Sequence, residues 1–291
     1  MLKKHLLRLI QQQPQHWVGN GFPVQTLFSY HDDLDELYSP FLLLDYVAPC
    51  SFSPTEQRRG VGAHPHRGFE TVTIVYAGEV EHRDSSGGGG IIGTGDVQWM
   101  TAAQGIVHEE FHSSRFGLTG GQFEVVQLWV NLPASAKMNP ARYQSLTQQQ
   151  IPTVMFPMHQ GHLRVIAGQF DAVNGAATTH TPIHIWDITL AAGAEVLLPI
   201  PENYSTLILI RQGTVAINSN ETPLKTGELG VFSLTGTGLT LTAEESTQLL
   251  LLSGEPIHEP IVGHGPFVMN TQAEIYQALV DYQQGKMGTL S

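Results

Sequence analysis

Residues 69–80 read FETVTIVYAGEV, and this stretch decides the fold. A run of β-branched and aromatic residues is interrupted at Gly78 and then resumes, which predicts a strand, a glycine turn and a second strand. Residues 204–215, YSTLILIRQGTV, can be laid over this stretch, and further along Gly95-Asp96 matches Gly227-Glu228. An internal repeat of this kind predicts two β-barrels of one ancestry.

The bulk composition agrees with a chain of many short strands. With 291 residues the chain is long enough for two domains of ordinary size. Its 30 glycines and 17 prolines favour frequent turns, and a hydrophobic share of 41% suffices for a buried core. We therefore expect an all-β protein with two jelly-roll (double-stranded β-helix) barrels and a short C-terminal helix.

The pattern of strands and breakers divides the chain into four segments. Prolines and glutamines gather between the two predicted barrels, which is typical of a linker or crossover. We expect, in chain order, an N-terminal extension with room for one short helix, a metal-binding barrel, a linker, and a second barrel without metal ligands that ends in a helix: residues 1–20, 21–135, 136–160 and 161–291.

The clearest helix signal lies in residues 270–282. Thr271 and Glu274 have the spacing of a capping box, and Gly285 suits the stop. One face of the predicted helix is apolar, through Ile275, Ala278, Leu279 and Tyr282.

Charge and cysteine content exclude several classes of protein. The formal net charge is −12, so general binding to nucleic acid is not expected. The single cysteine, Cys50, cannot form an internal disulfide, and its sequence neighbours offer no activating base. Neither a secretory signal nor a run of ~20 apolar residues is present, so we expect a cytoplasmic protein with no membrane contact.

Two short pairs of residues have side chains that can donate a nitrogen or oxygen atom to a metal ion. His64-Pro65-His66 and His108-Glu109-Glu110 each place donors at positions i and i+2. Residues two apart on a strand point to the same face of a sheet, so each pair can face one barrel interior. Two such pairs on neighbouring strands can bring four nitrogen and oxygen donors to one point, which suits a borderline divalent metal ion.

The internal repeat provides a control for this interpretation. A lone His-x-His pair is more often a chance or surface pair than a metal site. When the four donors are carried across the repeat, however, they fall on or near residues that cannot ligate in the same way: Pro199, Pro201, Thr240 and Thr242. The donors therefore belong to the first half alone, and the fold itself does not demand them.

The donor types limit the metal and its use. Four protein ligands would leave about two open positions on an octahedral ion, which can take water, O₂ or a pair of substrate oxygens. A closed structural zinc site would more typically use cysteine. We favour Fe(II) as the single divalent ion, with Mn, Ni, Cu and Zn as alternatives.

Three motifs together resemble the pirin family, whose members are bicupins of the cupin superfamily. They are HPHRGFET at 64–71, GDVQWMTA at 95–102 and GIVHEE at 105–110. The segments GEP at 254–256 and GPFVMN at 265–270 resemble the C-terminal pirin signature, so the resemblance covers nearly the whole chain.

The resemblance implies two cupin barrels and a metal, usually iron, held in the first barrel by three histidines and one glutamate. Those ligands fall on His64, His66, His108 and Glu110. Some pirins oxidise quercetin with O₂ and open the flavonol ring, whereas others are regulators that bind partner proteins. The chain departs from the general cupin motif at Ala103, where many cupins have proline.

Several residues near the motifs are candidates for supporting roles. Glu70 occupies the place of a ligand in many cupins, but in pirins the carboxylate of the second motif ligates instead, so a structural or outer-shell role is favoured. Arg67 is expected to pair with a carboxylate near the site, and His112 to lie beyond the metal on the His108 face. Three further residues are expected to form core and pocket wall: Gln98, Trp99 and Met100.

The leading hypothesis is an iron-dependent dioxygenase that acts with O₂ on quercetin or a related small aromatic, flavonol or enol-type substrate. The metal would lower the pKa of a substrate hydroxyl, and Glu110 would accept its proton as the catalytic base. The alternative is a metal- and redox-dependent regulatory module that binds a protein partner. A third hypothesis is a detoxifying or metabolic enzyme whose natural substrate is a catechol-like compound, with quercetin serving only as a substitute substrate.

Overall fold

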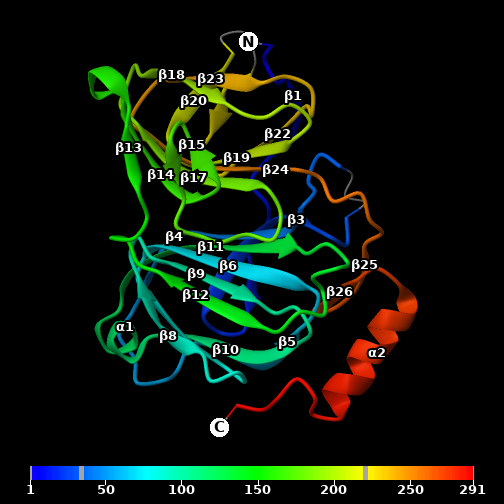
Figure 1. Ribbon diagram of the computed structural model, residues 1–291. Helices are drawn as coiled ribbons and strands as arrows, with labels where there is room; N and C mark the ends of the chain where they lie inside the picture. The colour runs from blue at the N-terminus through cyan, green and yellow to red at the C-terminus, as the bar shows by residue number, and fades with distance from the viewer. Residues whose placement is uncertain (1, 33–35, 219–221, 291) are drawn as a thin grey trace. The chain divides into compact units, whose positions relative to one another are not determined.

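The computed structural model describes residues 2–32, 36–218 and 222–290, and most of this chain forms β-strands (Figure 1). The chain divides into two compact units. Each unit contains a barrel, so the predicted all-β fold with two jelly-roll barrels is confirmed. We call them the first-barrel unit (residues 13–33, 41–148 and 257–291) and the second-barrel unit (residues 1–12, 34–40 and 149–256).

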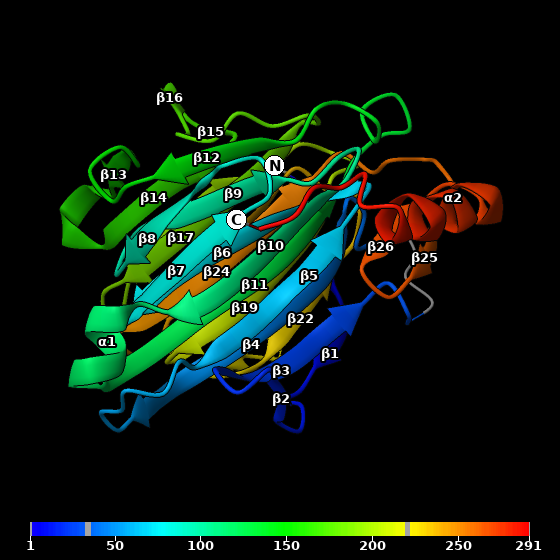
Figure 2. The same ribbon diagram turned by 90° about the horizontal axis from the view of Figure 1, so that it is seen from below.

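The first barrel consists of a seven-stranded and a four-stranded sheet, drawn from below in Figure 2. The larger sheet has the order β12-β9-β6-β11-β4-β3-β2: β12 Arg142–Leu146, β9 Val97–Thr101, β6 Phe69–Ala77, β11 Gly121–Asn131, β4 Phe41–Phe52, β3 Phe22–Ser29 and β2 His16–Val18. The smaller sheet has the order β5-β10-β7-β8: β5 Gly60–His66, β10 Ile106–His112, β7 Glu79–Asp84 and β8 Gly89–Gly93.

The second barrel has the same plan, again with seven and four strands. Its larger sheet has the order β1-β22-β19-β24-β17-β14-β13: β1 Leu6–Ile10, β22 Leu229–Phe232, β19 Ser205–Gln212, β24 Thr247–Gly254, β17 Ile183–Leu190, β14 Gly161–Ala167 and β13 Thr153–Met155. Its smaller sheet has the order β18-β23-β20-β21: β18 Glu195–Pro199, β23 Gly238–Ala243, β20 Thr214–Ile217 and β21 Leu224–Lys225. β6 and β19 occupy equivalent places, as the repeat predicted.

Residues 2–20 contain two edge strands, β1 in the second barrel and β2 in the first, so the short helix expected within residues 1–20 is wrong. β1 pairs with β22 in antiparallel register. Lys4 holds the segment in place, because its buried Nζ donates hydrogen bonds to the carbonyls of Tyr204, Ser233 and Leu234. Burial lowers the pKa of Lys4 to about 8, although Glu202 acts in the opposite direction. Pairing to an open sheet edge outweighs local helix propensity here.

The division into units differs from the predicted segment boundaries at two further places. Residues 136–160, predicted as a linker, contain the edge strands β12 and β13, which pair with β9 and β14. Residues 257–291, predicted as the end of the second barrel, belong to the first-barrel unit. They form the hairpin β25 Val262–His264 and β26 Phe267–Met269, followed by α2 Gln272–Gln283.

Helix α2 matches its sequence signals closely. Thr271 caps it by accepting a hydrogen bond from the backbone N–H of Glu274, and Gly285 follows its end with a φ of 71°. Ile275 and Ala278 are buried against Phe267 and Met269, and Leu279 packs partly against them. Tyr282, predicted on the same apolar face, is 40% exposed. In Figure 1, α2 (red) lies beside β26. A second α-helix, α1 Ser114–Thr119, has six residues, and Pro157–His159 form a short 3-10 helix. No helix in the described part of the chain is long and apolar enough to cross a membrane.

The interior of the second barrel is a continuous apolar core. Its buried residues are aliphatic or aromatic, and many have no exposed surface at all; they include Leu163, Trp186, Ile208, Phe232 and Leu251. Close packing of this kind is the normal state of a protein interior. The remaining hairpin of this unit, β15 Gln169–Phe170 with β16 Val173–Asn174, lies outside both sheets.

Candidate metal centre

The two donor pairs lie on adjacent strands of the first barrel. β5 and β10 pair so that His64 lies directly opposite His108. The register then shifts, because Glu110 lies opposite Val61, which places an extra residue in β5 beside the donors. Bulges of this kind occur often next to functional sites because they redirect side chains. The i, i+2 spacing that predicted convergence of the two pairs is thus realised on neighbouring strands.

Three histidines form the centre of the cluster. The ring centroids of His64, His66 and His108 lie 4.3–4.9 Å apart, and one ligand nitrogen from each ring lies within 4.8 Å of the others. Burial lowers the pKa of His66 and His108 well below the ordinary value, and the neighbouring histidines act in the same direction. Both rings are therefore neutral at pH 7, which is the form that binds metals.

Glu110 lies two residues after His108 on β10 and lines the same cavity as His64 and His66. Its carboxylate belongs to a second group of close donors, with His82 and His108, rather than to the group of three histidines. Thr73 Oγ1 lies 2.6 Å from Gln127 Oε1 and 3.4 Å from Glu110 Oε1. A hydroxyl carries one proton, so the shorter distance assigns it to Gln127 and leaves Glu110 available to a metal or a substrate.

The cluster suits a metal ion. His108 is completely buried, and among the described residues its Nε2 has no hydrogen-bond partner. Leaving such a nitrogen unpaired is unfavourable, and a metal would satisfy it. The Nδ1 of His64 lies 2.8 Å from the carbonyl of Gly62, which leaves its Nε2 as a further donor. Three imidazoles and one carboxylate match Fe, Mn, Ni, Cu or Zn better than Ca²⁺ or Mg²⁺.

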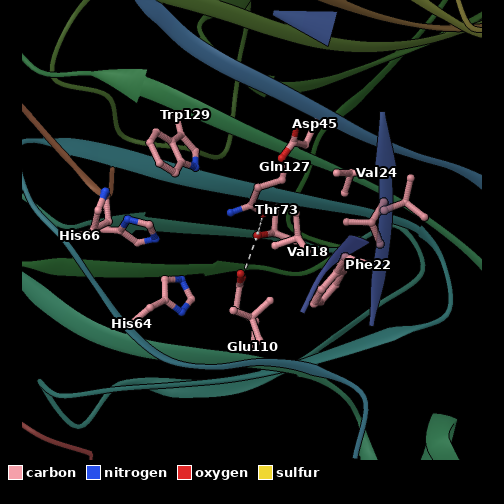
Figure 3. Close-up of a pocket in the computed structure, with 14 residues that line it drawn as sticks. Val18, Phe22, Val24, Asp45, His64, His66, Thr73, Glu110, Gln127 and Trp129 are labelled. Carbon is pink, nitrogen blue, oxygen red and sulfur yellow. Dashed lines mark hydrogen bonds between the residues drawn. The ribbon is translucent and has the colours of Figure 1, made fainter. Parts of the chain in front are cut away.

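A cavity of about 270 Å³ opens beside the cluster (Figure 3). His64, His66 and Trp129 lie at one end, and Glu110 and Thr73 lie along the middle. Phe22, Val24 and Asp45 lie toward the other end. Gln127 also lines the cavity, together with further apolar side chains: Val18, Val47, Val61 and Val125. Ligand pockets commonly combine an apolar wall with a few polar groups in this way.

The structure places Arg67 and Glu70 away from this cavity. Arg67 is buried and donates from Nε to the carbonyl of Gln104 and from NH1 to Asp281 of α2 at 2.9 Å. Thr73 lines the cavity and Glu70 lies three residues earlier on the same strand, so Glu70 faces the opposite side of the sheet. There it accepts a hydrogen bond from Thr101, and burial raises its pKa to about 7.

The other residues predicted near the site lie on different faces of β9 or at the far end of β10. Gln98 pairs with Thr73 and Met100 with Thr71, so both face the barrel interior, whereas Trp99 faces the other side. His112 lies at the far end of β10, where its Nε2 donates to the carbonyl of Gly21 and its ring packs among phenylalanines: Phe22, Phe52, Phe116 and Phe123.

Two residues that the sequence analysis missed lie next to His108. His82 and Asp84 are buried on β7, where Asp84 pairs in register with His108 and His82 with Glu110. Nδ1 of His82 lies 3.3 Å from Nδ1 of His108, and Nε2 of His82 lies 3.3 Å from the Asp84 carboxylate. The signal was present, because His82-Arg83-Asp84 has the same i, i+2 spacing as the two predicted pairs.

Comparison with known proteins decides the family. The Pirin family model matches residues 21–130, and the Pirin C-terminal cupin domain matches residues 185–288. A Pseudomonas aeruginosa protein, provisionally named a quercetin 2,3-dioxygenase, is 52% identical over 283 residues, which are 97% of this chain and 98% of the relative. The chain belongs to the pirin family. Its two barrels are therefore cupin barrels, as the motifs indicated.

Solved structures agree with this assignment. The crystal structure of a quercetin 2,3-dioxygenase from Acinetobacter baumannii superposes on this pirin with a TM-score of 0.95 and 52% identity, covering 99% of this chain and 100% of the other. The Escherichia coli pirin YhhW, solved in complex with nickel(II), has a TM-score of 0.62 and 20% identity over 86% of this chain and 100% of its own. At that identity the likeness concerns the fold.

The structure gives a reason for this pirin's departure from the general cupin motif. Ala103 is buried and adopts a φ of 41°. Proline is fixed near a φ of about −65° and cannot occupy this position without rebuilding the turn. The turn also fixes the metal motif, because the carbonyl of Ala103 accepts a hydrogen bond from the backbone N–H of Gly68 at 2.8 Å.

Proposed function

We propose that this pirin is a metal-dependent dioxygenase, with His64, His66, His108 and Glu110 holding one divalent ion, favoured to be Fe(II). Its substrate would be quercetin or a related flavonol or enol-type aromatic, and O₂ would be the oxidant that opens the central ring. The observation that carries the proposal is the cavity of about 270 Å³, which reaches His64, His66 and Glu110 directly. A closed structural metal site would have no such opening.

The cavity indicates the class of substrate. Its valine- and phenylalanine-lined end offers an apolar slot for an aromatic body, and His64, His66 and Glu110 offer the polar end where reacting oxygens would lie. Its volume is close to the ~300 Å³ lower bound of common small-molecule pockets, so a planar, compact molecule suits it. The 52%-identical relative and the 52%-identical crystal structure, both named quercetin 2,3-dioxygenases, support the same class.

Each group at the site would have a separate role in the proposed reaction. When bound, the metal would supply Lewis acidity that lowers the pKa of a substrate hydroxyl. Glu110 would accept the released proton on its carboxylate, since Thr73 donates chiefly to Gln127. The apolar slot would hold the aromatic rings and exclude water from the reacting carbon atoms. Asp45, whose Oδ1 accepts a hydrogen bond from Thr26, would bind a ring hydroxyl at the distant end.

Oxygen uptake with quercetin tests the proposal. Protein reconstituted anaerobically with Fe(II) is expected to consume O₂ over many turnovers per metal, and metal-free protein is expected to consume none beyond the spontaneous rate. Uptake that is equal in both samples would contradict it. The alternative of a metal- and redox-dependent module that binds a protein partner stays a prediction.

A further inference from the structure

Next to His108 lies a chain of buried polar groups that the proposed reaction does not use. It consists of His108, His82 and Asp84, whose side chains are almost wholly shielded from solvent. Two hydrogen bonds join them, one between the Nδ1 atoms of His108 and His82 and one between the Nε2 of His82 and the Asp84 carboxylate, both at 3.3 Å. Neither His82 nor Asp84 lines the cavity.

Asp84 is fixed by the turn between β7 and β8. Its Oδ1 accepts hydrogen bonds from the backbone N–H of Ser86, the hydroxyl of Ser86 and the backbone N–H of Gly88, at 2.6–3.0 Å. Its other oxygen, Oδ2, is the one that meets His82. Burial alone would raise the pKa of Asp84, but the hydrogen bonds from His82, Ser86 and Gly88 outweigh it and lower the pKa to about 2.

With both histidines neutral, an ionised Asp84 determines where their protons lie. A carboxylate only accepts hydrogen bonds, so Nε2 of His82 must carry a proton and donate it. In neutral His82 the Nδ1 is then an acceptor, so Nδ1 of His108 must be the donor. Neutral His108 is left with a lone pair on Nε2, the buried atom that has no hydrogen-bond partner among the described residues.

We propose that His82 and Asp84 are positioning residues for the metal centre, which fix the orientation and tautomer of the ligand His108 through this chain of hydrogen bonds. The inference rests on the metal site of the proposed function, but not on the reaction performed there. Partners of this kind commonly orient metal-binding histidines and raise their basicity. Here a second histidine stands between carboxylate and ligand, and the ring of Tyr143 stacks on it with centroids 5.5 Å apart.

A matched pair of variants tests the chain of hydrogen bonds. Asp84→Asn keeps the size of the side chain but lets its amide either donate or accept, so the tautomer of His82 is no longer imposed. Asp96→Asn is the control, because Asp96 also accepts backbone hydrogen bonds in a turn of the same barrel, from Gly93 and Gln148, without meeting a histidine.

The readouts are the Co(II) dissociation constant, from competition with a chelator, and the visible spectrum of the Co(II)-loaded protein. We expect Asp84→Asn to weaken Co(II) binding by about 10- to 100-fold and to change the spectrum. Asp96→Asn should leave both as in the wild-type chain. Unfolding midpoints of the metal-free proteins separate this effect from lost stability.

A second variant keeps the test decisive if Asp84→Asn does not fold. His82→Gln leaves the turn intact and interrupts the chain at its middle, and it should weaken Co(II) binding by a similar factor while one ion is still bound. Wild-type affinity and spectrum in both variants, or an equal loss in Asp96→Asn, would overturn the proposal. Complete loss of the ion in His82→Gln would overturn it in favour of His82 as a ligand. A wild-type chain that binds no Co(II) would instead refute the metal site itself.

Discussion

The two barrels have the same strand order, but the inward-facing side chains of their small sheets differ. In one barrel these side chains form a candidate metal site, and in the other they form a close-packed apolar core. In the first barrel six inward positions of the small sheet are polar, beside the apolar Val80, Ile92 and Ile106: His64, His66, His82, Asp84, His108 and Glu110. In the second barrel the inward positions of the equivalent sheet are aliphatic and buried: Val196, Leu198, Val215, Ile217, Leu239 and Leu241. The strand arrangement therefore fixes where the inward side chains lie. The identity of those side chains decides whether the interior is a polar cluster or an apolar core.

The largest difference between the barrels is expected when a metal ligand is removed. His66→Ala should abolish stoichiometric metal binding, a loss beyond the roughly 10- to 100-fold that follows removal of an outer-shell partner. The control is His184→Ala, which removes a largely buried histidine of the second barrel that packs against Trp186. It should leave one metal per chain by elemental analysis. Retention of the metal by His66→Ala would contradict the proposed site.

Next in size is the effect of removing the proposed base. Glu110→Gln should lower kcat by about 10²- to 10⁴-fold, because an amide cannot accept the substrate proton. The measurement is O₂ uptake per bound metal, so that any loss of metal is separated from lost chemistry. Glu109→Gln is the matched control, since Glu109 lies one residue away on the opposite face and pairs with Arg83. A Glu110→Gln enzyme with wild-type kcat would exclude the assigned role.

Equal truncations should cost different amounts of stability in the two barrels. Val215 lies in the sealed core of the second barrel, whereas Val125 borders the cavity of the first. Val215→Ala should lower the free energy of unfolding by about 2 kcal/mol, from lost burial and a new void. Val125→Ala should cost about half as much, because its cavity side already lacks packing partners. Chemical denaturation of the metal-free proteins measures both, and a larger loss for Val125→Ala would undermine the contrast.

The second barrel should also contribute to the pH dependence of stability. Burial lowers the pKa of His184 to about 4, from an ordinary value of 6.5. Between these values the unfolded chain binds a proton that the folded chain does not, so stability is lost as the pH falls from 6.5 towards 4. The slope is at most about 1.4 kcal/mol per pH unit for one histidine. Unfolding midpoints of the wild type and His184→Phe should diverge across this range; parallel curves would show that His184 does not titrate as stated.

The smallest expected effect concerns Asp45 at the far end of the cavity. Asp45→Asn should raise KM for quercetin by about 2- to 10-fold, which is the contribution of one hydrogen bond. It should leave KM unchanged for the flavonol that lacks both hydroxyls of the catechol ring. Steady-state O₂ uptake with the two substrates measures the difference. An equal change for both flavonols would show that Asp45 does not bind that ring.

Local rules were sufficient for much of the fold and the centre of the site. The two-residue period of a strand predicted that His64 and His66 would share a face, and the structure places both beside His108. Capping chemistry predicted α2, and Thr271 forms the expected bond with Glu274. These features depend on neighbours within a few residues, so a single sequence contains them.

Other features depend on which surfaces meet after folding. The pairing of β1 with β22 and the ion pair of Arg67 with Asp281 join residues about 220 positions apart, and no local pattern marks them. The repeat alignment also slipped by one residue. It matched the donors to positions such as Pro199 and Thr240, which lie outside the core, whereas the inward residues beside them are Leu198 and Leu239. A shift of one residue exchanges the two faces of a strand.

The central claim is that one barrel binds a metal and its sister does not. Anomalous diffraction from crystals grown with Fe(II) under anaerobic conditions tests it most directly. We predict one anomalous peak per chain, in contact with His64, His66, His108 and Glu110, and none inside the second barrel. A peak held by other residues, or one within the core around Leu251, would contradict the account.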